Sequence, residues 1–241
     1  MSEQRDDYQG RHAIVTGGTG ALGLAVVREL IGRGATVSIP VFEPKELGRL
    51  TDGERERVTA VEGVDLSDEA SASGFYGGVC REHGGLWASV HVAGGFAFAP
   101  VEEAGADVLD SMYATNVKTC YLSCREAIRV MRASGGGRIV NIAAGPALRP
   151  EQGAKMTAYT MSKAAVGAMT GALAEEVKGD GILINAVAPS IFDTPANRAA
   201  MPDADHDAWP KPDQIASAIA FLGSPTNTLT SGAVVPVYGR S

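Results

Sequence analysis

The stretch Ala13-Ile14-Val15-Thr16-Gly17-Gly18-Thr19-Gly20-Ala21-Leu22-Gly23 decides the fold of this 241-residue chain. It joins a short apolar run, typical of a buried strand, to apolar residues at helical spacing over residues 24–31. Glycines at such a junction let the backbone approach a pyrophosphate, whose charge then faces the helix N-terminus. A plain tight turn also needs glycines, but the position directly after the first strand favours a dinucleotide site. Its candidate residues are Gly17, Thr19, Gly20, Leu22 and Gly23.

The rest of the chain repeats this alternation of strand and helix. Strand patterns occupy residues 36–42, 58–64, 87–92, 138–143, 182–187 and 233–237, and helical patterns occupy 67–82, 101–131, 159–177 and 212–222. The alternation predicts one α/β domain over residues 1–241, a doubly wound parallel sheet with helices on both faces. Within it, three glycines predict a weak or broken helix over residues 67–82. Pro40 predicts an irregular, edge-like end to the second strand.

Composition and charge argue against several classes of function. The net charge of -7 comes without a basic run, so nucleic acid and anionic membrane are poor candidates as partners. No apolar run approaches ~18 residues and residues 1–9 are polar, so we expect a soluble, cytoplasmic protein without a signal peptide. The three cysteines, Cys80, Cys120 and Cys124, predict free thiols in a reducing compartment. The four histidines are scattered without metal-ligand spacing, so no metal is predicted.

A second motif, Tyr159-Thr160-Met161-Ser162-Lys163, starts an Ala-rich helical pattern. Residues four apart share one face of a helix, so Tyr159 and Lys163 point the same way. A phenol with a reference pKa near ~10 is a poor base, but a fixed ammonium beside it stabilises the phenolate and lowers that pKa. Such a pair can exchange a proton with a carbinol oxygen. The spacing alone also fits an ordinary surface pair that supports a helix.

The cofactor preference depends on the end of the second strand. In dinucleotide folds an acidic residue there binds the adenosine ribose hydroxyls and selects against a 2′-phosphate. That register falls on Val41 or Phe42, and Glu43 is the first acid after it. No arginine occupies the position either, so the choice between NAD and NADP stays open.

Residues 190–210 form a long polar segment that contains three prolines. A loop of this length in a compact domain is usually functional or mobile. We interpret it as a substrate lid, with a floppy surface insertion as the alternative. Its residues fix no recognisable pocket chemistry, so the sequence does not name the substrate.

With these motifs in place, residues 11–239 resemble a short-chain dehydrogenase/reductase. The motifs that follow the family's order and approximate spacing are the glycine turn, Asp65-Leu66, Ala93-Gly94, Asn116, Tyr159-x-x-x-Lys163, Asn185, and Pro189 with Thr194. The resemblance implies an NAD(P)-binding Rossmann fold and hydride transfer between nicotinamide and the carbonyl or secondary alcohol of a small molecule. Members of this family usually form homodimers or homotetramers through the helices that match residues 101–131 and 159–177. Apolar residues there fit either such an interface or a buried core.

The resemblance also implies a role for each matched residue. Tyr159 would donate or accept the proton, Lys163 would hold the nicotinamide ribose and lower the tyrosine pKa, and Asn116 would support a water-linked proton path. The remaining matched residues would bind the cofactor: Asp65 and Leu66 at the adenine, Ala93 and Gly94 along its length, and Pro189 with Thr194 near the carboxamide.

The chain departs from the family pattern in the glycine turn and after the fourth strand. Ala21 takes the middle glycine position, and Gly20 is shifted one residue earlier. This arrangement resembles longer members of the family, although the length and the C-terminal part match the short members. His91-Val92 stands where the family carries Asn-Asn.

A third departure bears on the chemistry. Ala144 stands where the family carries a serine that hydrogen-bonds the substrate oxygen, and a methyl group cannot donate. Losing one such donor commonly costs ~3–4 kcal/mol in the barrier. Thr157 and Ser190 are candidate substitutes. Three hypotheses follow: an oxidoreductase that uses Tyr159, an impaired relative that only binds the dinucleotide, and an epimerase or dehydratase with tightly held cofactor, the last suggested by the shifted glycine turn.

Overall fold

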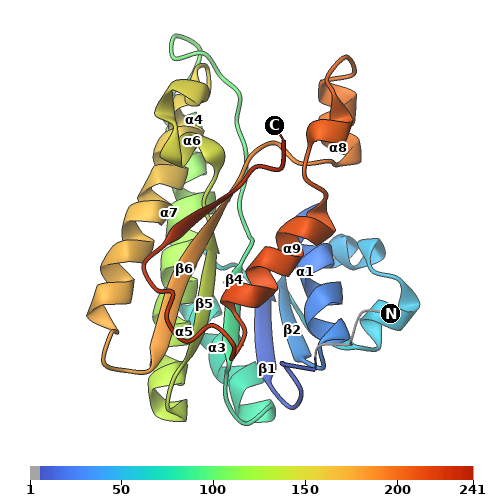
Figure 1. The fold of residues 1–241 in the computed structure, drawn as a ribbon, viewed down its shortest axis with the longest axis vertical. Helices are drawn as coiled ribbons and strands as arrows, with labels where there is room; N and C mark the ends of the chain where they lie inside the picture. Colours follow the sequence, from blue (N-terminus) through green and yellow to red (C-terminus); the bar gives the residue numbers. More distant parts are fainter. Residues whose placement is uncertain (1–5, 241) are drawn as a thin grey trace.

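A computed structural model describes residues 6–240, which form a seven-stranded parallel sheet (Figure 1). The strands lie in the order β3-β2-β1-β4-β5-β6-β7. Their bounds are β1 His12–Thr16, β2 Thr36–Val41, β3 Val58–Glu62, β4 Ala88–His91, β5 Gly137–Ile142, β6 Ile182–Pro189 and β7 Val234–Val237. The predicted parallel sheet is confirmed. The strand order reverses between β1 and β4, the place where open α/β sheets bind ligands.

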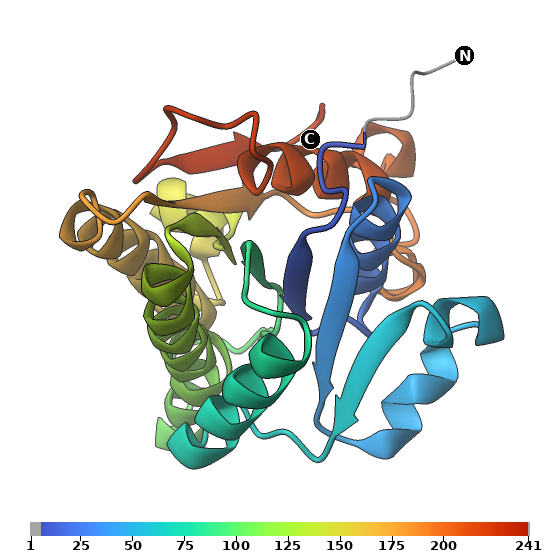
Figure 2. The same ribbon diagram turned by 90° about the horizontal axis from the view of Figure 1, so that it is seen from below.

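Helices cover both faces of this sheet (Figure 2). On one face, α1 (Ala21–Gly32) lies beside α9 (Pro212–Leu222). On the other face lie α3 (Glu69–Glu82), α5 (Thr119–Ser134) and α7 (Thr157–Glu176). Within residues 6–240, no helix combines the length and the apolar content needed to cross a lipid bilayer.

Two apolar cores result from the alternation of side chains along the strands. In β1, Val15 belongs to the core that contains Val26 of α1 and Ile219 of α9. The neighbouring Ile14 belongs to the opposite core, with Phe75 of α3. Helices cover both cores, so a ligand can bind at the carboxyl edge of the sheet rather than on its faces.

Two predicted helices differ from the sequence expectation. Helix α3 is continuous despite its glycines, because its apolar side chains are buried and Asp68 caps its start by accepting from the Ser71 amide at 2.8 Å. The helix expected over residues 101–131 is instead α4 (Ala106–Met112), a π-helical turn η2 (Tyr113–Lys118) and α5. Apolar periodicity did not distinguish a π-helical turn from the α-helix around it.

Pro40 does not mark an edge strand, because β2 lies inside the sheet between β1 and β3. Ser38 is the last residue of β2 that pairs with β1, and Pro40 comes after it. Pro40 has no backbone N–H, but no hydrogen bond between β1 and β2 is lost at this position.

Short elements that the sequence did not predict fill three connections, each after the carboxyl end of a strand. They are η1 (Pro44–Arg49) and α2 (Asp52–Arg55) after β2, α6 (Gly145–Leu148) and η3 (Pro150–Gly153) after β5, and α8 (Pro195–Ala200) and η4 (His206–Ala208) after β6. Elements this short carry too few turns for hydrophobic periodicity to reveal them. Among them, η1 reaches the edge where the site forms, since Glu46 and Arg49 line the cavity described below.

The glycine turn packs so tightly that two of its positions admit no side chain. Gly17 has a φ of +64°, and a Cβ there would lie 2.8 Å from the Ala93 amide nitrogen. A Cβ on Gly23 would lie 2.0 Å from the carbonyl oxygen of Gly17. On Gly20 the same atom would make an ordinary contact of 3.4 Å with that oxygen. Ala21 is exposed as the first residue of α1, which explains why the turn accepts alanine at this position.

We expect Gly23→Ala to destabilise the chain by about 3 kcal/mol and to abolish dinucleotide binding, because the methyl forces α1 away from the turn. Gly20→Ala is the matched control, and it should change stability by less than about 1 kcal/mol. Urea unfolding and NADH fluorescence titration measure both effects. Equal behaviour of the two variants would contradict the close approach of α1 to Gly17.

Candidate active site

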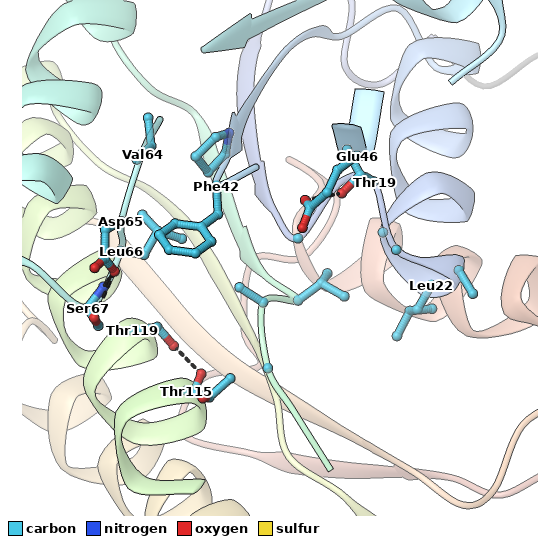
Figure 3. A pocket seen from close by; sticks show the side chains of 18 of the residues that line it. Thr19, Leu22, Phe42, Glu46, Val64, Asp65, Leu66, Ser67, Thr115 and Thr119 are labelled. Atoms are coloured by element: carbon cyan, nitrogen blue, oxygen red, sulfur yellow. Dashed lines mark hydrogen bonds between the residues drawn. The ribbon is translucent and has the colours of Figure 1, made fainter. Parts of the chain in front are cut away.

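A cavity of about 620 Å³ opens at the carboxyl edge, between the turn after β1 and the loop after β4. Figure 3 shows Thr19 and Glu46 on one side of it, Asp65, Leu66 and Ser67 on the other, and Phe42 between them. The predicted cofactor residues that line it are Gly17, Thr19, Gly20, Leu22, Gly23, Asp65, Leu66, Ala93 and Gly94. Its lining, within residues 6–240, leaves out the other predicted site residues: Asn116, Tyr159, Lys163, Pro189 and Thr194.

Hydrogen bonds fix the carboxylate of Asp65 at one side of the cavity. Its Oδ1 accepts from the amide of Ser67 at 2.8 Å and from the Ser67 hydroxyl at 2.7 Å. The Asp65 amide donates to the Ser71 hydroxyl at 2.9 Å. A fixed acceptor in an apolar setting beside Leu66 suits the amino group of an adenine.

The other side of the cavity holds two charged residues that sequence reasoning missed. The hydroxyl of Thr19 donates to Oε2 of Glu46 at 3.0 Å, and Arg49 also lines the cavity. Both belong to η1, so they return to the cavity several residues after the strand end that was searched for an acid or an arginine. The sequence analysis found no arginine at the strand end, and Arg49 reaches the cavity lining from η1, which the sequence did not predict.

Asn116 lies in the π-helical turn η2 and joins the loop after β4 to α7. Its Oδ1 accepts from the Gly95 amide at 2.9 Å, and its Nδ2 donates to the Gly95 carbonyl at 3.1 Å. Nδ2 also donates to the Ser162 hydroxyl at 3.0 Å, and that hydroxyl donates to the Tyr159 carbonyl at 2.7 Å. Single π-turns inside helices frequently mark functional sites. Ser162, inside the Tyr–Lys motif, is therefore a positioning residue that the sequence analysis did not single out.

Gly94 connects the cavity to the predicted catalytic residues. It lines the cavity, and a Cβ on it would lie 2.6 Å from Oδ1 of Asn116 and 3.3 Å from Nζ of Lys163. Lys163 and Tyr159 both lie on α7, one helical turn apart. The ring of Phe96 packs edge-on against the ring of Tyr159, with 5.0 Å between centroids.

The pKa of Tyr159 differs from the sequence expectation. Burial raises the pKa of this phenol to about 12, and burial lowers the pKa of the Lys163 amine to about 8. The ammonium donates to the Ile142 carbonyl at 2.9 Å. The expected lowering of the tyrosine pKa by Lys163 is not present in the free chain, where desolvation is the cause of the shift.

The candidate substitutes for a serine after β5 have other partners or positions. Ala144 is buried directly before α6. The hydroxyl of Ser190 donates to the carbonyls of Ile191 at 3.1 Å and Tyr238 at 3.0 Å. Thr157 is exposed as the first residue of α7.

Residues 190–210 contain the short elements α8 and η4. Pro189 ends β6, and the hydroxyl of Thr194 caps α8 by accepting from an amide at 3.1 Å. Asp193 forms ion pairs with Arg198 and Lys211, which tie the two ends of the segment together. Phe192, which sequence reasoning missed, reaches the lining of the cavity.

The close glycine turn lies at the point of strand reversal, where open α/β sheets bind ligands, and the predicted group of Asn116, Tyr159 and Lys163 lies beyond it. The family model described as short chain dehydrogenase matches residues 11–205. The chain belongs to this family, whose members are NAD(P)-dependent oxidoreductases.

Named relatives agree with this assignment. The chain is 31% identical over 243 residues to 4-formylbenzenesulfonate dehydrogenase of Comamonas testosteroni, covering 94% of this chain and 96% of that protein. It is 28% identical over 257 residues to 2,3-dihydroxy-2,3-dihydro-p-cumate dehydrogenase of Pseudomonas putida, covering 100% and 98%. The fold matches a short-chain type dehydrogenase/reductase from Mycobacterium ulcerans with a TM-score of 0.89 and 23% identity, covering 96% of this chain and 90% of that one.

Lys163→Met should stabilise the chain at pH 7 without cofactor. Burial lowers the pKa of Lys163 from 10.5 to about 8, so between these values the folded chain binds fewer protons and wild-type stability rises with pH. Below pH 8 the buried charge costs about 3 kcal/mol, from which we subtract about 1 kcal/mol for the lost hydrogen bond. The expected gain is therefore about 2 kcal/mol at pH 7, vanishing near pH 10.

Urea unfolding at pH 7 and pH 9.5 measures this difference. Lys178→Met is the matched control, because Lys178 is exposed and pairs only at the surface with Glu175. A Lys163 variant less stable than wild type at pH 7 would show that the ammonium stabilises the free chain.

Proposed function

We propose that the chain reduces a small-molecule carbonyl with NAD(P)H, or oxidises the matching secondary alcohol, and that Tyr159 carries the proton. One observation supports this role: Asn116 and Lys163 lie against Gly94, a residue that also lines the dinucleotide cavity. Tyr159 precedes Lys163 by one turn of α7, so it stands beside the same end of the cavity. The tight turn at Gly17 and Gly23 fits a pyrophosphate, because no side chain there keeps the phosphate oxygens away from the backbone.

The dinucleotide, when bound, supplies or accepts the hydride. The chain's own residues donate the proton and stabilise the phenolate that remains. With a pKa of about 12, the Tyr159 phenol is protonated at neutral pH and can act as the acid in carbonyl reduction. Lys163 keeps most of its charge at pH 7, and it can hold ribose hydroxyls while stabilising the phenolate that forms. Asn116 fixes the loop after β4 and the second turn of α7 relative to each other.

We further propose that Ala144 takes the place of the family's serine. The chain then lacks one donor to the developing alkoxide, at a cost of about 3–4 kcal/mol in the barrier. This favours a second candidate function, dinucleotide binding with little or no turnover. Ala143-Ala144-Gly145, which offers no hydroxyl after β5, is the observation behind it.

Tyr159→Phe removes only the phenol oxygen. Since general acid catalysis contributes ~10²–10⁴, we expect turnover of NAD(P)H with a carbonyl panel to fall about a thousandfold. Cofactor affinity should change by less than about threefold, because the ring and Lys163 remain. Absorbance and fluorescence titration measure the two quantities. Tyr113→Phe, at an exposed tyrosine of η2, is the control that should leave both unchanged.

Ala144→Ser tests the missing donor in the same assays. We expect the rate to rise by about 10–100-fold at unchanged cofactor affinity. Binding without turnover in the wild type, followed by turnover in this variant, would favour the second candidate. An intact rate in Tyr159→Phe would mean that another group carries the proton.

We propose that NAD(H) is preferred over NADP(H). The carboxylate of Glu46 is held by Thr19 beside the glycine turn, where it can accept from ribose hydroxyls and repel a 2′-phosphate. Arg49, which would attract that phosphate, is exposed, so solvent weakens its charge more than that of the half-buried Glu46.

Glu46→Gln should raise NADPH affinity relative to NADH about tenfold, equivalent to about 1.4 kcal/mol of removed repulsion. Arg49→Gln is the matched control and should shift the ratio slightly the other way. Parallel fluorescence titrations at one ionic strength measure the ratio. Tighter binding of NADPH by the wild type would assign the ribose site to Arg49 instead.

We also propose roles for the segment at residues 190–210 and for the outer helices. The segment would cover the substrate, a role supported by Phe192 in the cavity lining. Copies of the chain would pair as a homodimer or homotetramer through α4, α5 and α7. Leu109, Tyr121 and Met161, one from each helix, are exposed apolar side chains that support such an interface.

A further inference from the structure

Behind the active site, four side chains converge from elements that are distant in the sequence. His91 ends β4, Asn141 lies in β5, and Cys120 and Cys124 lie one turn apart on α5. All four are buried, with at most 4% of any of them exposed. The linear spacing of histidines and cysteines did not predict this cluster, because two strands and a helix contribute to it. Only the four-residue separation of Cys120 and Cys124 carried a signal.

The cluster is centred on one amide oxygen. Oδ1 of Asn141 lies 2.8 Å from Nδ1 of His91, 3.3 Å from the sulfur of Cys120 and 3.4 Å from the sulfur of Cys124. Nδ1 of His91 also lies 3.5 Å from the sulfur of Cys124. A carbonyl oxygen has two lone pairs, so three donors exceed its capacity. The imidazole and the two thiols therefore cannot all donate to this oxygen at once.

These separations correspond to four of the six edges of a coordination tetrahedron, and the ligand atoms of His91, Cys120 and Cys124 all lie within 4.8 Å of one another. With Zn–S near ~2.3 Å and Zn–N or Zn–O near ~2.1 Å, neighbouring ligand atoms lie about 3.3–3.8 Å apart. Three of the separations within the cluster are 3.3, 3.4 and 3.5 Å. The fourth, between His91 and Asn141, would open by roughly half an ångström to accept an ion.

Outer hydrogen bonds already turn two of the ligating atoms inward. Nε2 of His91 lies 2.8 Å from the Ser89 hydroxyl, which leaves Nδ1 facing the sulfurs. Nδ2 of Asn141 donates to the Thr170 hydroxyl at 3.0 Å, which fixes Oδ1 toward the cluster. Metal-binding imidazoles and amides are typically oriented in this way by a second set of contacts.

Charge balance and helix geometry favour an ion over a disulfide. A divalent cation with two thiolates, a neutral imidazole and a neutral amide carries no net charge, which suits a buried site. Side chains four apart on a helix have Cβ atoms about 5–6 Å apart, too far for a disulfide, which needs about 3.5–4.5 Å.

We propose that His91, Cys120, Cys124 and Asn141 form a structural site for a tetrahedral divalent metal ion, with Zn²⁺ as the natural occupant. The ion would join β4, β5 and α5 directly behind the catalytic group. His91 lies two residues before Ala93, and Asn141 precedes Ile142, whose carbonyl accepts from Lys163. Because the four ligands are buried, we expect the ion to enter as the chain folds.

The test measures metal in the untagged full chain, expressed with added zinc. We expect about one zinc per chain in the wild type. Cys120→Ser and Cys124→Ser should each lower the zinc content at least about tenfold, since a neutral hydroxyl replaces a thiolate ligand. Cys80→Ser is the matched control, because Cys80 is buried in α3 outside the cluster and should leave the zinc content unchanged.

A second measurement does not depend on metal acquired in the cell. Wild type refolded from denaturant with Co²⁺ should show thiolate-to-cobalt charge transfer and the visible bands of tetrahedral cobalt, whereas the cluster variants should show neither. Wild type without zinc after expression and without these bands after refolding would overturn the proposal. The serine variants distinguish a metal site from a buried hydrogen-bonded cluster. A serine hydroxyl can still donate to Asn141, but it does not replace a thiolate ligand. None of these readouts depends on turnover, so they stand apart from the test of the dehydrogenase function.

Discussion

The close backbone approach of the glycine turn is the constraint on which the site depends. The start of α1 lies against the carbonyl of Gly17, and Gly17 in turn lies against the amide of Ala93. The next residue, Gly94, lies against Asn116 and Lys163. Close backbone contacts therefore connect the first strand to α7. Any bulk inserted along this line would move the glycine turn away from Asn116 and Lys163.

The sequence predicted what depends on long periodic patterns, and it missed what depends on short turns. The strands and the two faces of helices followed from apolar runs that each have several buried members. The cavity lining followed from the glycine turn and from the motifs shared with the family. Glu46 and Arg49 were not predicted as lining residues, because η1 folds back on the cavity and its sequence has no periodic pattern. The hydrogen bonds of the Asn116 amide were also not predicted, because a π-helical turn has the same sequence pattern as an α-helix.

The tyrosine illustrates how burial can reverse a prediction based on charge alone. An ammonium one turn away stabilises a phenolate, but only if it points at the oxygen and both groups are hydrated enough to stay charged. Here the amine of Lys163 is engaged with Ile142, and desolvation raises the pKa of Tyr159 while lowering that of Lys163. Spacing in a sequence reports which face two groups share, whereas their protonation depends on what covers that face.

The ion pairs of Asp193 determine which solution conditions can loosen residues 190–210. Two cations share this carboxylate, and their hydrogen bonds hold its pKa well below the usual range, so mild acid leaves the pairs intact. Both cations are partly exposed, and exposed charges are screened as the ionic strength rises. The mobility of this segment should therefore depend on salt concentration rather than on acidity. A high-salt medium would loosen the segment more than a dilute one.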